Sequence, residues 1–354
     1  MKKYLCLLLI LSLAIPLVFA AGGRESESPV SPEAVKQEAA PPKIVIYTSM
    51  YDVVIKNVEK ELYSKFPGYD IVFVYGGTGI LQARIASQQS SGQLGCDILM
   101  VAEPAYSLEL KDKGMLHPFK SKEASSLAFD YDPDGYWYPV RVSNMVLAYN
   151  PERFLKSVLP NSFYDFAYDP RALGVISMRN PIVSGTTMAT ATALRDKYGY
   201  GYFEALGKQR IIIDYGAEES LRKLETGECK VVMILEESIL RARQISNSRL
   251  EVIYPTDGTV IIPSTIMIVN DKWSANKNSR AAEEICEWFL SAAGQNAIVD
   301  GWMHSVRKDF PRLPFNSKPI AEIRANSIPV IWDNVFRQRD DIRKRFEEYI
   351  AVRY

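Results

Sequence analysis

The chain has 354 residues, of which 47% are hydrophobic, enough to build one large core or two domain-sized cores. It carries 42 basic and 42 acidic residues, so its formal net charge is zero. This balance argues against the strongly basic surface of a nucleic-acid-binding protein and favours a small neutral or compact charged partner.

The first twenty residues have the pattern of a secretory signal peptide. Two lysines precede an apolar run from Tyr4 to Phe19, and Val18-Phe19-Ala20 forms a small-x-small cleavage signal. The run is short for a membrane span of about 20 residues. We expect residues 1–20 to be removed on export and the mature protein to be periplasmic. Residues 21–42 are polar, contain proline and lack periodicity, which predicts a flexible linker.

Three cysteines remain after this cleavage, at positions 96, 229 and 286. Their number is odd and their spacing wide, so no disulfide framework is predicted. We expect buried free thiols.

The first elements of the mature chain alternate between strands and helices. The run "KIVIYT" predicts a strand, and Val54, Ile55, Val58 and Leu62 then recur at helical spacing. The run "YDIVFVY", a helix from about Ile80 and the run "CDILMVA" follow. This order predicts a mostly parallel sheet that helices cover on both faces.

A second series of the same kind starts near Val146. It runs through "VLAYN", "GVISM", a helix after Ser184, "RIIID", a helix over 216–226, "KVVMIL" and "LEVIYP". We therefore predict a second α/β lobe. Beyond "VIIPSTIMIV", helices over about 279–293 and towards residue 354 have no sheet of their own, so we expect them to cover the first lobe.

The whole mature chain resembles the type 2 periplasmic solute-binding proteins of ABC transporters, in the branch that binds ferric iron or hexose phosphates. Six segments in the same order carry this resemblance: "IVIYTSMYDVVIKNVEKELYSKFPG", "CDILMVAEPAYSLELKDKGMLHPF", "YWYPVRVSNMVLAYNP", "SMRNPIVSGTTMATATAL", "AAEEICEWFLSAAGQNAIV" and "SVRKDFPRLP".

The resemblance implies a two-lobed Venus-flytrap fold with a ligand in the cleft and delivery to a membrane permease that a separate ATPase powers. We expect an N-terminal lobe of residues 43–140 and 261–354 and a C-terminal lobe of residues 141–260. We expect a monomer without cofactor or resident metal.

Three loops that follow strands offer hydrogen-bond donors to such a ligand. They are Ser49-Met50-Tyr51, the glycine-rich loop at Thr78 and Gly79, and the run Ser184 to Thr187. In open parallel sheets ligands bind beyond the carboxyl ends of strands, where helix N-termini favour an anion. The alternative for the last run is a helix cap alone. Arg179, and also Arg141, could add positive charge.

Acceptors follow two further strands. Asp214 is the last residue of "RIIID" and Tyr215 follows it, while Glu236 and Glu237 follow "KVVMIL". We expect the carboxylates at both strand ends to face the cleft and to accept hydrogen bonds from sugar hydroxyls. The alternative is that they only stabilise helix N-termini. The predicted ligand-binding residues are Ser49, Met50, Tyr51, Thr78, Gly79, Arg179, Ser184, Gly185, Thr186, Thr187, Asp214, Tyr215, Glu236 and Glu237.

The sequence departs from both kinds of relative. Iron binders of this branch carry adjacent tyrosines where this chain has Glu236-Glu237-Ser238, so the resemblance favours a phosphorylated organic anion, a hexose phosphate first. The histidine that hexose-phosphate binders place before the aspartate is Ile213 here, which leaves the sugar open. Ferric iron and a phosphonate stay as alternatives.

An enzyme receives little support from the sequence. The chain has two histidines and neither a G-x-S-x-G nor an H-E-x-x-H motif. Paired carboxylates such as Asp214 and Glu237 also serve glycosidases, so a carboxylate-based hydrolase is the alternative from a different class. We expect a binding protein and not an enzyme.

Overall fold

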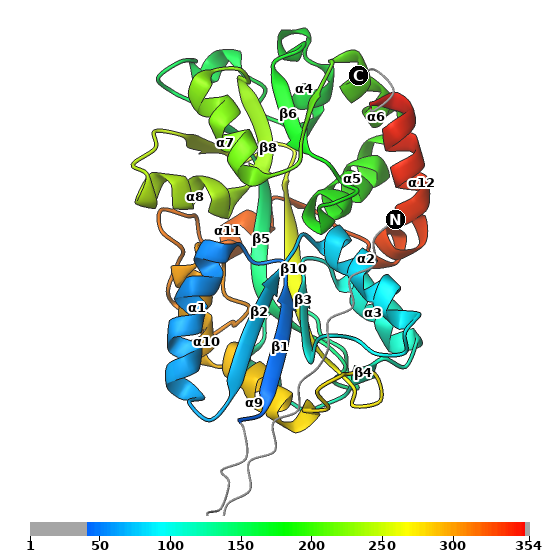
Figure 1. Ribbon diagram of the computed structural model, residues 1–354. Coiled ribbons are helices and arrows are strands. Elements are labelled where there is room, and N and C mark those ends of the chain that lie inside the picture. Colours follow the sequence, from blue (N-terminus) through cyan, green and yellow to red (C-terminus); the bar gives the residue numbers. More distant parts are fainter. Residues whose placement is uncertain (1–40, 351–354) are drawn as a thin grey trace, which may run out of the picture. The chain divides into compact units, whose positions relative to one another are not determined.

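The computed structural model describes residues 41–350, and Figure 1 shows the arrangement of their elements. The predicted signal peptide and nearly all of the predicted linker lie outside the described residues. Within residues 41–350, no helix combines the length and the apolar character that crossing a bilayer requires.

The first lobe forms as the sequence predicts. Strands β1 (Lys43–Thr48), β2 (Asp70–Tyr75) and β3 (Ile98–Val101) lie parallel in the order β2-β1-β3, and α1 (Asp52–Lys65), α2 (Thr78–Gln89) and α3 (Pro104–Asp112) connect them onward. Val54, Val58 and Leu62 of α1 are buried at the predicted helical spacing. Because the strands are parallel, all three end at the same edge of the sheet.

The second lobe repeats this arrangement with β6 (Ile176–Arg179), β7 (Ile212–Asp214) and β8 (Val231–Leu235). Helices α5 (Gly185–Tyr198), α6 (Gly201–Lys208), α7 (Ala217–Thr226) and α8 (Glu236–Ile245) accompany them. The small side chains of "GTTMATATAL" let α5 pack on several sides, so all ten of these residues are buried.

Two long antiparallel strands join the lobes into one sheet of order β2-β1-β3-β10-β5-β8-β6-β7. Strand β5 (Tyr138–Tyr149) pairs along β10 (Thr259–Val269), and β10 pairs onward with β3 while β5 pairs onward with β8. The register shifts between Ser264 and Thr265. These two strands, seen at the centre of Figure 1, are the crossings between the lobes.

The remaining elements are short or lie at the periphery. They are β4 (Leu116–His117), η1 (Ala124–Ser126), η2 (Lys156–Val158), α4 (Phe163–Tyr168), η3 (Pro170–Ala172), β9 (Glu251–Ile253), α9 (Ser279–Leu290), α10 (Ala292–Asp300), α11 (Ile320–Ala325), β11 (Ser327–Ile328) and α12 (Trp332–Tyr349). Strand β9 pairs with β5, and β4 and β11 pair with β10.

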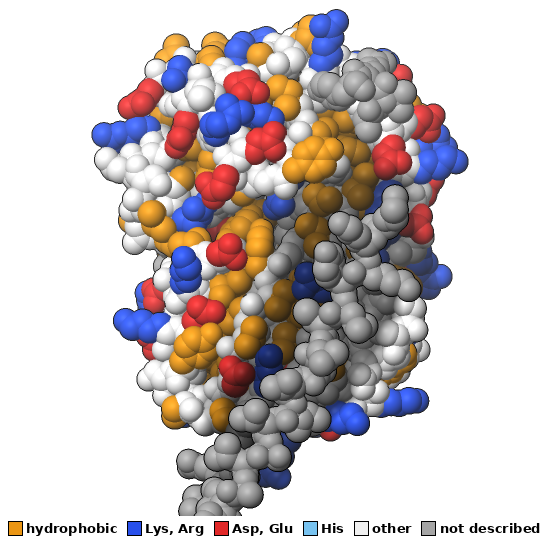
Figure 2. Space-filling view, in the orientation of Figure 1, with side chains coloured by type: hydrophobic (Ala, Val, Ile, Leu, Met, Phe, Trp, Pro, Cys, Tyr) orange, Lys and Arg blue, Asp and Glu red, His pale blue; other side chains and the backbone are white. Residues whose placement is uncertain are grey.

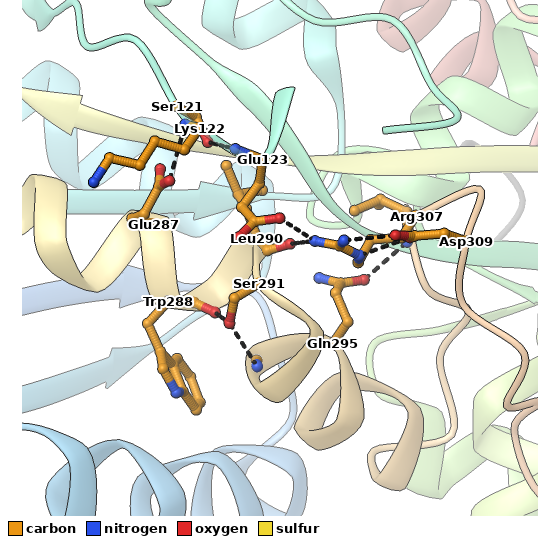
Figure 3. Close-up of polar contacts among 12 residues, drawn as sticks. Ser121, Lys122, Glu123, Glu287, Trp288, Leu290, Ser291, Gln295, Arg307 and Asp309 are labelled. Atoms are coloured by element: carbon orange, nitrogen blue, oxygen red, sulfur yellow. Dashed lines mark hydrogen bonds and ion pairs between the residues drawn. The ribbon is translucent and has the colours of Figure 1, made fainter. Parts of the chain in front are cut away.

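Gln295 of α10 ties three of the family-like segments together. Its amide nitrogen donates to the carbonyl oxygens of Val140 at 2.9 Å and Phe289 at 2.8 Å. Its amide oxygen accepts the backbone N–H of Val306 at 2.9 Å, and Arg307 lies nearby in a second set of polar contacts (Figure 3). The hydrogen bonds of Gln295 therefore hold β5, the end of α9 and the segment after α10 together in the first lobe.

Helix α12 packs differently from the expectation. Val335, Ile342 and Phe346 form a buried apolar stripe on α12. These side chains share a core with the second lobe, where the Phe346 ring meets Phe203 of α6 edge to face. The expectation that the C-terminal helices cover the first lobe alone is therefore wrong for α12, which packs its apolar side on the second-lobe core and joins the first lobe through the ion pair of Arg339 with Glu103.

The surface and the cysteines agree with the composition. Acidic and basic side chains are interspersed over the face drawn in Figure 2, as expected for a chain with balanced charge. Cys96, Cys229 and Cys286 are free and buried, which confirms the predicted thiols.

Candidate functional site

A pocket lies where the strand ends of both lobes meet. It encloses about 360 Å³ of space free of atoms, part of which is open to solvent. The lining residues are Ser49, Tyr51, Tyr75, Gly77, Thr78, Ala102, Arg141, Arg179, Ser184, Gly185, Thr186, Leu235 and Glu237. Loops after β1, β2, β3, β6 and β8 contribute, so parallel strand ends bring these residues together.

The first-lobe loops present hydroxyl groups, as predicted for Ser49, Tyr51 and Thr78. Thr78 begins α2, and its hydroxyl oxygen accepts the backbone N–H of Ala102 at 3.2 Å. Tyr75 was not among the predicted residues, although its position at the end of β2, directly before the glycine loop, signals a pocket residue.

The start of α5 answers the choice between helix cap and pocket residue, because Ser184 is both. Its hydroxyl oxygen accepts the backbone N–H of Thr187 at 3.3 Å and the hydroxyl of Thr187 at 2.9 Å. Ser184, Gly185 and Thr186 line the pocket, whereas Thr187 is buried beneath them as a cap partner. The backbone N–H groups of the first helical turn point towards the pocket end of α5.

Two arginines bring positive charge into the pocket. Arg141 of β5 is only 2% exposed, and its guanidinium donates to the Ser49 hydroxyl oxygen at 3.0 Å and to the Met303 sulfur at 3.0 Å. Within the described part of the chain, the buried Nε atoms of Arg141 and Arg179 have no hydrogen-bond partner. Among residues 41–350, neither side chain forms an ion pair with a carboxylate, and the charge of Glu237 only partly offsets the burial of Arg141.

Burial shifts the pKa of two groups at the pocket. It lowers the pKa of Arg141 and raises the pKa of the Tyr75 phenol, which Tyr51 raises further. A ligand that brings negative charge would relieve the cost of burying Arg141.

Glu237 is the carboxylate that lines this pocket. It is 3% exposed, and its Oε1 accepts the Ser143 hydroxyl at 2.8 Å. Burial raises its pKa to about 7, although the nearby charge of Arg141 opposes the rise. The group is therefore close to half protonated at neutral pH and can accept or donate a hydrogen bond.

Glu236, which we expected in the cleft, does not line this pocket. Its Oε2 accepts Asn144 Nδ2 at 2.7 Å and lies 3.2 Å from His304 Nε2, and its Oε1 accepts the hydroxyls of Ser317 at 2.6 Å and of Tyr254. Burial alone would raise its pKa, but His304 and these hydroxyls lower it. Glu236 thus serves as a buried anchor between β5, α8 and the loop after α10.

Asp214 and Tyr215 also lie elsewhere, contrary to the expectation. Asp214 is fully buried, and its carboxylate accepts Lys223 Nζ at 2.5 Å and the hydroxyls of Ser177 at 2.8 Å and Ser220 at 2.6 Å. Its negative charge is satisfied inside the second lobe by Lys223. Tyr215 is 68% exposed and is not among the pocket residues.

Two residues of the first-lobe loops that we expected to bind the ligand, Met50 and Gly79, do not line the pocket. Met50 is fully buried in the core beneath β1 and is not a pocket residue. Gly79 lies beside the pocket, against the backbone of Ile182, instead of lining it.

The donor set of the pocket fits an anion. The pocket contains one carboxylate, that of Glu237, and many hydrogen-bond donors. The donors are two guanidinium groups, six aliphatic or phenolic hydroxyl groups and the first turns of α2 and α5. Among residues 41–350, no group of three histidine, cysteine or acidic side chains is arranged to hold a metal ion.

The sequence profile of the bacterial extracellular solute-binding proteins matches residues 96–335. The chain belongs to this family. It is therefore an extracellular solute-binding protein of the ABC importer type, a binding component and not an enzyme, with a small-molecule ligand and a permease partner.

Solved structures share the fold. Iron-bound HitA from Pseudomonas aeruginosa is 19% identical, with a TM-score of 0.75 over 87% of this chain and 99% of its own. AfuA from Actinobacillus pleuropneumoniae, with fructose 6-phosphate bound, is 20% identical, with a TM-score of 0.74 over 88% of this chain and 99% of its own. These similarities confirm the two-lobed type 2 α/β fold.

A third structure, the ferric binding protein from Campylobacter jejuni, is 18% identical, with a TM-score of 0.72 over 86% of this chain and 99% of its own. Comparison with functionally curated sequences finds no matching relative. The neighbours thus include binders of iron and of a sugar phosphate, and the ligand must be argued from the pocket of this chain.

Proposed function

We propose that this solute-binding protein captures a small phosphorylated organic anion, a hexose phosphate first, and delivers it to the permease of an ABC importer. One observation carries the proposal: Arg141 is buried at the pocket beside the hydroxyl donors of both lobes, and no carboxylate of residues 41–350 forms an ion pair with it. A buried cation is costly unless an anion pairs with it, and a phosphate supplies that charge with several acceptor oxygens.

Two observations favour a hexose among the phosphorylated compounds. Glu237 gives the pocket an acceptor for sugar hydroxyls, next to donors suited to the phosphate. AfuA, which shares the fold, is known with fructose 6-phosphate bound. We also propose that residues 1–20 direct export and that the protein acts in the periplasm as a monomer.

Ferric iron is the second candidate, because Tyr51, Tyr75 and Glu237 line the same pocket and HitA is an iron-bound relative in fold. Arg141 and Arg179 oppose it by repelling a trivalent cation. Burial opposes it too, since the raised pKa of Tyr75 makes a phenolate harder to form.

Calorimetric titration tests the proposal with glucose 6-phosphate, inorganic phosphate and glucose. We expect Thr186→Ala to weaken the binding of glucose 6-phosphate and of inorganic phosphate by similar factors, because it removes a hydrogen-bond donor to the phosphate. We expect Glu237→Ala to weaken glucose 6-phosphate and to spare inorganic phosphate. The exposed Thr226→Ala on α7 is the matched control. Absence of binding of both phosphorylated compounds to the wild type would overturn the proposal.

A further inference from the structure

The two lobes meet through glycines at the mouth of the pocket. A Cβ atom on Gly79, near the start of α2, would lie 2.3 Å from the carbonyl oxygen of Ile182. On Gly77 it would lie 2.6 Å from the carbonyl oxygen of Val183. Backbone atoms cannot move aside as the end of a flexible side chain can, so only glycine permits this approach.

The reverse side of the contact repeats this requirement. Gly185 begins α5, and a Cβ on it would lie 2.7 Å from Cβ of Thr78, the first residue of α2. Thr78 and Thr186 are 2% and 5% exposed, so the contact shuts out solvent. The first turns of α2 and α5 therefore face each other at van der Waals distance beside the pocket.

None of these glycines is needed for backbone conformation. Gly77, Gly79 and Gly185 are absent from the positive-φ positions, where glycine would be favoured. Gly79 and Gly185 lie in the first turns of α2 and α5, where alanine is a better helix former than glycine, so each helix would accept alanine there. The need for glycine arises only where the two lobes touch.

The electrostatics of this contact oppose closure of an empty pocket. Helix N-termini carry partial positive charge, and two of them here lie beside Arg141 and Arg179. Like charges brought together in a desolvated site repel, and a bound anion converts that repulsion into attraction. Glu237, hydrogen-bonded to Ser143, offsets only part of the positive charge.

We propose that Gly77, Gly79 and Gly185 form a closing clamp that lets the starts of α2 and α5 meet, and that an anion between them completes the closed state. The part concerning the anion rests on the proposed function, whereas the steric part does not. Closure is then gated by the charge of the ligand, so an uncharged sugar of the same shape leaves the lobes apart.

Alanine variants test the steric part. We expect Gly79→Ala and Gly185→Ala to weaken glucose 6-phosphate about tenfold or more, because overpacking penalises only the closed state. Their thermal melting without ligand should not fall. Gly201→Ala is the matched control, since Gly201 also begins a helix but its Cβ would meet only the Tyr168 hydroxyl at 3.9 Å. Wild-type affinity in both clamp variants would overturn the clamp.

A cross-link tests the clamp without reliance on any ligand. In the double variant Thr78→Cys with Gly185→Cys, the two Cβ atoms would lie 2.7 Å apart at full contact. A disulfide needs about 3.5 to 4.5 Å, so it forms when the lobes come to within about 1 Å of full closure. Oxidation with diamide, followed by non-reducing electrophoresis and mass spectrometry, should reveal this bond. Each single variant controls for pairing with the native cysteines.

The outcomes separate the two ideas. The cross-linking is run without a probe and with each probe at about ten times its dissociation constant. If no cross-link forms under any of these conditions, the clamp is wrong. If the cross-link forms although the wild type binds no phosphorylated probe, the clamp stands and the proposed ligand is wrong. If glucose 6-phosphate and inorganic phosphate fail to speed the cross-link relative to glucose, gating by charge is wrong.

Discussion

Lys223 Nζ lies 2.5 Å from Oδ1 of Asp214, and both side chains are buried inside the second lobe. The pair is closed off from the pocket, and two serine hydroxyls complete the hydrogen bonds of the carboxylate. Asp214 therefore stabilises the packing of β7 against α7 and does not contact the pocket.

Asp214→Ala should destabilise the protein by about 3 to 5 kcal/mol, because it leaves the buried Lys223 charge without its partner. Urea unfolding measures this loss. The folded fraction should keep wild-type affinity for glucose 6-phosphate. Glu228→Ala, which breaks an exposed pair with Arg222, is the control and should change stability by under about 1 kcal/mol. A selective loss of affinity without loss of stability would return Asp214 to the ligand site.

The strand order and the donor loops could be predicted because they depend on local patterns. Alternating strand and helix periods located β1 to β3 and β6 to β8, and the position of Ser184 after a strand was enough to place it near the pocket. Parallel strand ends gather at one edge whatever the details of packing.

The positions of the acidic side chains could not be predicted in the same way. Glu236 turns from the pocket because His304 and Ser317, 68 and 81 residues away in sequence, meet it. For Asp214 a local signal existed, since Ser220 and Lys223 lie three residues apart on one face of α7 and both reach the carboxylate. Arg141 sits in a strand that the sequence pattern recognised only from Val146 onward.

Arg141→Met should weaken the binding of inorganic phosphate and of glucose 6-phosphate by similar factors. A charge-assisted hydrogen bond contributes about 1.5 to 3 kcal/mol, which is a loss of roughly 10- to 150-fold. Calorimetry on both compounds measures it. Arg249→Met is the control, because that side chain is 68% exposed and makes only a 3.8 Å ion pair. Unchanged phosphate affinity in Arg141→Met would remove the main support for an anion site.

Addition of ferric citrate should produce no visible tyrosinate-to-iron absorption band. The chain lacks an adjacent tyrosine pair, and Tyr51 and Tyr75 share their pocket with two guanidinium groups that repel the metal ion. Absorption spectroscopy during titration checks this, with Tyr51→Phe as the companion variant. A stoichiometric coloured complex that Tyr51→Phe abolishes would make iron the better ligand.

Gln295→Ala should destabilise the first lobe without changing the contacts of the pocket. The substitution leaves two buried backbone carbonyl oxygens and the N–H of Val306 without a partner, at a cost of about 1 to 3 kcal/mol for each group left unsatisfied. Thermal unfolding measures the effect, and the half-buried Asn296→Ala beside it, whose side chain accepts a hydrogen bond from Arg312, serves as the control. Equal stability of the two variants would show that water replaces the lost hydrogen bonds.

Glu237 makes stability depend on pH, and the sign follows from the direction of its shift. Burial raises its pKa to about 7 from an ordinary value of 4.5, so between these values the folded state holds a proton that the unfolded state has released. The free energy of unfolding should therefore fall as pH rises from about 4.5 to 7, by roughly 3 kcal/mol in total at higher pH. In Glu237→Gln, which has no proton to lose, this part of the fall should vanish, and the variant should gain on the wild type as pH rises. Urea unfolding of both proteins at pH 5.5 and pH 8 decides the matter: a constant difference between them would mean that Glu237 ionises normally, and its carboxylate would then repel a phosphate at neutral pH.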